Sequence, residues 1–180
     1  MRYTSVALLV ILASPAIAQT RTMAKKVVPA RSSAVADIRA NWKTLSGYVL
    51  QSAIDVPEDK YGFKASADVR SFAELFAHVA GSQSMFCAVA LGEPQPPEDA
   101  VKATTKAALI DALRKSNADC DRAYVQSDAA ASRTVDVFGE RRSRLYALML
   151  NATHDGEHYG NLVTYMRMNG LVPPSSKPTP

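Results

Sequence analysis

Apolar residues recur with helical spacing in four long segments of this chain. In the first segment they fall at alternating intervals of three and four residues, which places them on one face of a helix. These positions are Val35, Ile38, Trp42, Leu45 and Val49. The pattern predicts a helix that begins at Ser32 or Ser33 and ends near Ile54, because Pro57 and the residues after it cannot continue it.

The second helical segment has a marked beginning and a marked end. Ser71 and Glu74 have the spacing of a capping box, in which the serine accepts from an early backbone N–H and the glutamate bonds back. The apolar stripe that follows consists of Phe72, Leu75, Phe76, Val79 and Phe86. His78 flanks this stripe. Gly92 and the prolines after it end the helix and open a connection of about a dozen residues.

Two further helices complete the pattern. The third is predicted from about Lys106 to Tyr124. The fourth is the longest, from about Ser143 to Asn169, and Gly170 suits the position just after a helix. In each segment the apolar positions again lie on one helical face, so that both helices can pack against the first two.

Strand signals are nearly absent from the sequence. The only candidate is the short segment 134–138, in which polar residues alternate with two valines, inside a connection that spans residues 127–142. One such segment does not change the fold class. Four long helices with apolar seams predict an all-α protein with the fold of a four-helix bundle, over residues 32–172.

The first eighteen residues have the features of a secretory signal peptide. Arg2 supplies a positive charge, residues 6–13 form a short apolar run, and Ala16 and Ala18 are the small residues that precede cleavage. A membrane-spanning helix needs about 20 apolar residues, and Pro15 interrupts this run too early. We therefore expect an exported protein, periplasmic or secreted, with no membrane contact after cleavage.

The rest of the chain excludes several classes of function. Removal of residues 1–18 lowers the formal net charge from +4 to +3, and the basic residues are spread along the chain. A nucleic-acid-binding protein would concentrate them on one element, so we expect no nucleic-acid partner. No Gly-x-Ser-x-Gly elbow, phosphate-binding glycine loop or dinucleotide fingerprint occurs. We expect residues 19–31 to form a flexible leader and residues 173–180 a tail.

The chain has three histidines, and their positions point to one metal site. His154 and His158 are four residues apart on a predicted helix, so they lie on the same face one turn from each other. His78 lies on another helix and can join them only if the fold brings the two helices together. Metal sites in helix bundles are built from side chains on facing helices. We therefore predict that His78, His154 and His158 hold one metal ion.

The ligand set indicates the kind of metal and its use. Three imidazoles with no obvious fourth protein ligand leave open positions, which is typical of catalytic metal sites. Nitrogen ligands favour zinc or nickel, with iron as a further candidate, over magnesium or calcium. Several nearby polar residues could orient the rings, although no catalytic residue can be assigned among them. They are Glu74, Asn151, Asp155, Glu157 and Tyr159.

A metalloprotease is excluded although the segment from His154 to His158 is close to the motif His-Glu-x-x-His. The position of the general base holds Asp155, whose side chain is one methylene shorter than glutamate. No histidine, aspartate or glutamate follows His158, so the usual downstream third ligand is missing.

The two histidine segments resemble those of the DinB/YfiT-like family of metal-binding four-helix bundles. Residues 70–80 are similar to the family's second-helix motif around His78, and residues 154–162 to its His-x-x-x-His motif. Residues 57–63 resemble the family's interhelical loop. The resemblance covers essentially the whole domain and implies that the three histidines are the metal ligands. It departs at Asn161, where many relatives have a glutamine.

The resemblance also implies the broader properties of the protein. Family members bind a divalent metal, often nickel or zinc, and are frequently dimers, so a homodimer is expected. Some relatives use the metal to activate a low-molecular-weight thiol for transfer or isomerisation. The sequence therefore indicates a metal-dependent transferase or hydrolase acting on a small molecule. The alternative is a non-catalytic metal-binding or structural module, and a polar pocket over the metal would favour the enzyme.

Cys87 and Cys120 lie near the ends of the second and third helices. In antiparallel helices they would be separated by about 20 Å, at ~1.5 Å per residue. The long proline-rich connection can instead run back along the bundle and make the two helices parallel, as in the resembled family. The cysteines then stand at similar heights. Export to an oxidising compartment favours a disulfide between them, and two buried free thiols are the alternative.

Overall fold

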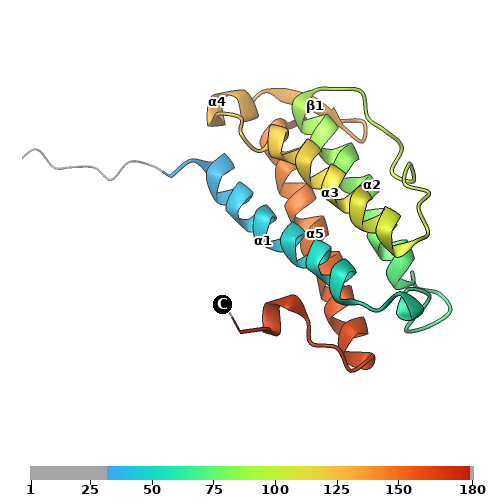
Figure 1. The fold of residues 1–180 in the computed structure, drawn as a ribbon. Coiled ribbons are helices and arrows are strands. Elements are labelled where there is room, and N and C mark those ends of the chain that lie inside the picture. Colours follow the sequence, from blue (N-terminus) through green and yellow to red (C-terminus); the bar gives the residue numbers. More distant parts are fainter. Residues whose placement is uncertain (1–31, 179–180) are drawn as a thin grey trace, which may run out of the picture. The chain divides into compact units, whose positions relative to one another are not determined.

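The computed structural model describes residues 32–178, and the expected signal peptide and leader lie outside them. Long helices dominate the fold (Figure 1), and four of them exceed fifteen residues. They are α1 (Ala34–Asp55), α2 (Phe72–Leu91), α3 (Lys106–Ala123) and α5 (Arg144–Met168). The short elements are η1 (Glu58–Lys60), α4 (Asp128–Ala131), β1 (Thr134–Val137), β2 (Glu140–Ser143) and η2 (Pro174–Ser176). None of the helices in residues 32–178 is long and apolar enough to cross a membrane.

The long helices begin and end close to where the sequence predicts. Ser33, Ser71 and Ser143 each accept a hydrogen bond from the backbone N–H three residues later, as helix N-caps do. Glu74 completes the capping box of α2 by accepting from the Ser71 N–H at 2.7 Å. Gly92 ends α2 with a left-handed φ of 73°, a conformation that favours glycine. The prediction of an all-α bundle is confirmed.

Helices α2 and α3 run parallel, as expected. Gln83 of α2 donates to Asn117 of α3 at 3.0 Å, and one turn further along both helices Cys87 meets Cys120. The connection 92–105 returns along the bundle between the end of α2 and the start of α3 (Figure 1). This return explains why the connection is longer than a tight turn requires.

The remaining helix pairs fix the arrangement of the bundle. Phe72 at the start of α2 packs on Tyr165 near the end of α5, with ring centroids 5.5 Å apart, so α2 and α5 are antiparallel. Tyr48 in the second half of α1 stacks on Tyr159 in the second half of α5, with centroids 4.9 Å apart, which makes α1 and α5 parallel. Helix α5 therefore contacts both α1 and α2 along its length.

The core of the bundle has an aromatic cluster toward each end, and a buried polar side chain lies beside one of them. At one end Phe72, Phe76 and Tyr61 are buried together with Tyr165. Toward the other end Trp42 stacks on Tyr124 with centroids 4.4 Å apart, beside the two cysteines. The Trp42 indole N–H donates to Oε1 of Gln83 at 2.9 Å, so a fully buried amide lies next to the aromatic pair.

A β-hairpin lies between the third and the fifth helix, where the sequence predicts only one strand. Segment 134–137 forms β1 and pairs with β2 in an antiparallel register from Thr134 and Ser143 to Val137 and Glu140. Phe138 and Gly139 both have positive φ, 55° and 85°, as the two-residue hairpin turn requires. The second strand was not predicted, because its residues, Glu140–Ser143, include no apolar residue. The segment therefore shows no alternation of apolar and polar positions.

Cys87 and Cys120 form a disulfide. Their Cα atoms are 5.2 Å apart, within the range that a disulfide spans, and the bridge joins α2 to α3. The structure therefore supports a disulfide over the alternative of two free thiols. The side-chain amide of Asn151 on α5 lies 3.7 Å from both sulfur atoms, so the bridge sits where three helices meet.

We expect removal of this bridge to destabilise the protein substantially. The cysteines are 33 residues apart, and the chain-entropy argument gives about 4 kcal/mol for a loop of this length. The double variant Cys87→Ala/Cys120→Ala should lose about this free energy of unfolding in urea titrations. Reductant should destabilise the wild type and leave the double variant unchanged. Two titratable thiols in wild-type protein denatured without reductant would contradict the bridge.

Candidate metal centre

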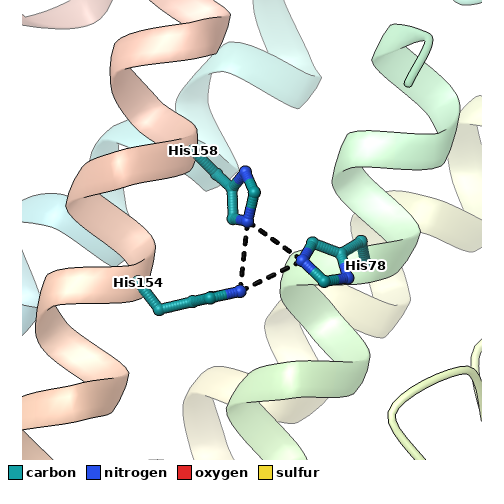
Figure 2. A group of neighbouring side chains, drawn as sticks. All are labelled: His78, His154 and His158. Carbon is teal, nitrogen blue, oxygen red and sulfur yellow. Dashed lines mark hydrogen bonds between the residues drawn. The ribbon is translucent and has the colours of Figure 1, made fainter. Parts of the chain in front are cut away.

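The fold brings the three histidines together between α2 and α5. His78 comes from the middle of α2, and His154 and His158 come from successive turns of α5, which runs antiparallel to it. All three rings point their Nε2 atoms at one another (Figure 2). The Nε2 atoms are 2.9 Å apart for His78 and His158, 3.0 Å for His78 and His154, and 3.1 Å for His154 and His158.

The rings are neutral at physiological pH. Burial, followed by the charge of Arg70, lowers the pKa of His78 to about 4. Burial and the neighbouring His158 lower the pKa of His154 to about 3, and burial lowers the pKa of His158 as well. A neutral imidazole carries one proton and one lone pair. Three converging Nε2 atoms with lone pairs form a group that could hold a metal ion.

Glu98 fixes the orientation of the His78 ring. Its Oε1 atom lies 2.9 Å from Nδ1 of His78, so the carboxylate accepts the Nδ1 proton and leaves the lone pair on Nε2. Glu98 reaches this place because the connection 92–105 lies against α2 at Gly81. A Cβ atom at position 81 would overlap the carbonyl oxygen of Glu98. Glu98 was not predicted from the sequence, because its distance to His78 depends on the path of the connection.

The other two rings have different surroundings. The side-chain amide of Asn161 lies 3.3 Å from Nδ1 of His158. A half-turn of this amide places its oxygen there, where it can accept the Nδ1 proton and leave Nε2 free for a metal. Nδ1 of His154 is buried and has no partner among residues 32–178. The edge of this ring packs against Phe86, with centroids 5.5 Å apart.

The five polar residues that the sequence placed near the histidines lie in three kinds of position. Asn151 and Asp155 face the interior of the bundle, where both are fully buried. Glu157 faces a cavity beside His158. The Glu74 carboxylate accepts the capping-box hydrogen bond of Ser71 and pairs with Lys64. The Tyr159 hydroxyl donates to Ser175. Within residues 32–178 none of the five forms a hydrogen bond to a histidine ring.

Asp155 is the most unusual of these groups. Both carboxylate oxygens are buried without a hydrogen-bond partner in the described part of the chain. Burial raises its pKa well above the usual value of an aspartate. It directly follows His154, which places it about 100° around α5 from that residue, and it lies outside the group of side chains that could share a metal ion.

Two cavities open beside the histidines. One, of about 670 Å³, reaches His158 and Asn161, and the other, of about 520 Å³, reaches His78 and Glu98. Arg70 and Glu74 line both cavities. His158 and His78 are thus accessible from the cavities, while Phe86 packs against His154.

A four-helix bundle with two parallel pairs and three histidines converging from α2 and α5 defines a class of metal-binding proteins. The sequence profile of the DinB superfamily matches residues 38–162, and the chain belongs to this superfamily. The recognition made from the two histidine motifs is therefore confirmed. No curated protein matches the chain.

Solved structures show the same fold. A DinB-like protein from Bacillus cereus ATCC 10987 superposes with a TM-score of 0.67 at 16% identity, covering 76% of this chain and 93% of its own. A DinB-like protein from Bacillus subtilis has a TM-score of 0.57 at 20% identity, covering 74% and 92%. The mycothiol-dependent maleylpyruvate isomerase has a TM-score of 0.59 at 17% identity, covering 76% of this chain and 69% of its own. At these identities the likeness concerns the fold.

We expect the metal-free protein to lose stability as the pH falls from about 6.5 toward 4. Unfolded histidines bind protons near pH 6.5. Folded His78 and His154 bind theirs only near pH 4 and pH 3, so the unfolded state holds more protons across this window and acid favours it. Urea titrations with chelator at pH 7, 6 and 5 should show a smaller loss for His154→Gln than for wild type.

The pH dependence of stability must be compared between variants, because Asp155 changes stability with pH in the opposite direction to the histidines. Its raised pKa means that the folded state keeps a proton which the unfolded state releases, so acid favours the folded state at this residue. Thr153→Ala is a matched control, because this exposed side chain bonds only to its own helix. Equal pH dependence in wild type and His154→Gln would contradict the buried neutral ring.

Proposed function

We propose that this protein is a metal-dependent enzyme, a transferase or hydrolase, that acts on a small molecule. His78, His154 and His158 hold one divalent transition metal in this proposal. The observation that carries it is the convergence of three Nε2 atoms within 3.1 Å of one another beside two cavities lined mainly by charged and polar residues. Sites of this kind bind small molecules.

The chain's own groups account for the metal binding. Burial keeps the three rings neutral, so their lone pairs need not be freed by loss of a proton at neutral pH. Glu98 and Asn161 hold two of the rings by their Nδ1 atoms. Nitrogen ligands favour zinc or nickel, with iron as a further candidate. A bound metal of this type supplies Lewis acidity, which turns water or a thiol into a nucleophile near neutral pH.

One of the structures with the same fold is an enzyme of known activity, and it supports part of the proposed reaction type. That relative is the mycothiol-dependent maleylpyruvate isomerase, in which the same fold serves thiol chemistry. We propose that the present protein is exported, in agreement with the expected signal peptide and with the disulfide between Cys87 and Cys120. Low-molecular-weight thiol cofactors are scarce outside the cytosol. We therefore leave both transfer and hydrolysis open.

The alternative function is a non-catalytic module that holds the metal for structure. Such a site would be capped by packed apolar side chains. Phe86 covers His154 in this manner, but His158 and His78 border cavities whose walls include Arg70 and Glu74. The open polar side favours the enzyme. We keep a homodimer as an expectation from the family resemblance.

We expect one metal ion per folded chain, lost on replacement of any one of the three histidines by alanine. Elemental analysis of protein purified from its own compartment gives the native metal and the stoichiometry. At a free metal concentration of 100 times Kd the metal should stabilise the protein by about 2.7 kcal/mol, because it binds only the folded form. Thr153→Ala should retain the metal. Full occupancy in His78→Ala would show that α2 does not contribute a ligand.

Glu98 should be needed for full metal affinity. Loss of a partner that orients a metal-bound histidine lowers affinity by roughly 10–100-fold. Glu98→Ala should show this loss in chelator competition, and Glu98→Gln a smaller one, because an amide oxygen still accepts from Nδ1. Glu93→Ala is the control, since Glu93 lies in the same connection but pairs with Arg122 at 2.6 Å. Wild-type affinity in Glu98→Ala would refute the orienting role.

A further inference from the structure

Arg70 stands between the two cavities beside the histidines. It lines both cavities and directly precedes Ser71, the N-cap of α2. Its backbone carbonyl accepts a hydrogen bond from the hydroxyl of Tyr165 at 3.0 Å, which ties this point of the chain to α5. The base of the side chain is therefore held firmly, while the residue itself is exposed.

The guanidinium of Arg70 has no acidic partner in the described part of the chain. No carboxylate oxygen of residues 32–178 forms an ion pair with it, and its side chain makes no hydrogen bond there. Lys64, the other basic residue in these cavities, is paired with Glu74 at 2.9 Å. Burial is the main cause of the lowered pKa of each histidine ring, and the charge of Arg70 contributes to each.

The surroundings of Arg70 select one kind of anion. A guanidinium presents a planar fork of N–H groups, which matches the two oxygens of a carboxylate. The larger cavity is lined by three acidic residues, Asp68, Glu74 and Glu157, against the two basic residues Lys64 and Arg70. This excess of negative charge disfavours a dianion such as a phosphate. A carboxylate carries a single charge, which one arginine can balance.

We propose that Arg70 binds the carboxylate of a small carboxylic acid whose reacting group lies at the three histidines. The proposal rests on the proposed function for the reacting end of the substrate. His78 lies six residues into α2, about 9 Å along its axis at ~1.5 Å per residue, and Arg70 lies two residues before the helix begins. The arginine side chain and an acid of a few carbon atoms span this distance together. Val69 and Leu75 supply apolar wall for the carbon chain.

The test compares two probes of nearly the same shape, the negatively charged 3-mercaptopropionate and its neutral amide, 3-mercaptopropionamide. Titration calorimetry of wild-type protein carrying its metal should show the acid binding at least about tenfold more tightly, the size of a hydrogen-bonded charge pair. Arg70→Gln should bind both probes equally, and Arg70→Lys should keep part of the preference. Arg122→Gln is the matched control, because Arg122 pairs with Glu93 and lines neither cavity.

The outcomes separate this proposal from the proposed function. An acid preference that persists in folded Arg70→Gln, as direct binding of the carboxylate to the metal would produce, overturns the role of Arg70. So does a failure of both probes to bind at millimolar concentrations. If Arg70→Gln does not fold, Arg70→Lys decides: a reduced preference supports the proposal and a wild-type preference overturns it.

Metal analysis of the same samples tests the metal site of the proposed function. A sample with one metal ion and no acid preference overturns the carboxylate site and leaves the metal site standing. Protein that takes up no zinc, nickel or iron when these are supplied, yet still prefers the acid through Arg70, supports the carboxylate site and overturns the proposed function.

Discussion

The fully buried amide of Gln83 constrains the whole bundle. It accepts from the Trp42 indole on α1 at 2.9 Å and donates to Ser116 and Asn117 on α3 at 3.2 and 3.0 Å. A buried amide that loses such partners costs free energy, so only one relative height of these helices satisfies it. Five residues before it on α2 lies His78. The amide thus sets the height of that histidine relative to α1 and α3, and the contact between Phe72 and Tyr165 sets it relative to α5.

The site itself opposes stability in the absence of metal. The three imidazoles converge with their Nε2 lone pairs facing one another. Within residues 32–178, neither Nδ1 of His154 nor the buried carboxylate of the next residue, Asp155, has a hydrogen-bond partner. Buried polar groups without partners each cost free energy. The disulfide between Cys87 and Cys120 and the aromatic core offset these costs. A fold with such supports can keep the rings in place before a metal arrives.

The two sides of the histidine group differ in chemistry. On one side Phe86 lies against His154, and it also contacts Phe138 of the hairpin turn, with the ring centroids of the two phenylalanines 5.9 Å apart. On the other side the walls are charged and include Arg70. Water and polar groups can therefore reach His158 and His78 from the two cavities. This asymmetry orients any molecule that binds there.

The sequence by itself determined the helices and the histidines, because both depend on short-range rules. Helical spacing of apolar residues, the capping box at Ser71 and the i,i+4 pair His154 and His158 are local patterns, and they predicted α1, α2, α3 and α5 closely. The family motifs added the parallel course of α2 and α3 and the expectation that His78 joins the pair. The hairpin partner β2 escaped, since an exposed polar strand has no pattern of its own.

Tertiary structure alone decided what surrounds the histidines. Glu98 reaches His78 only because the connection 92–105 returns along α2. The connection can lie this close to α2 because Gly81 has no side chain that would overlap the backbone of Glu98. Arg70 borders both cavities only because α2 and α5 pack with Tyr165 against its backbone. Such contacts join residues on different elements, and their distances follow from packing and from the path of loops, which no local spacing encodes.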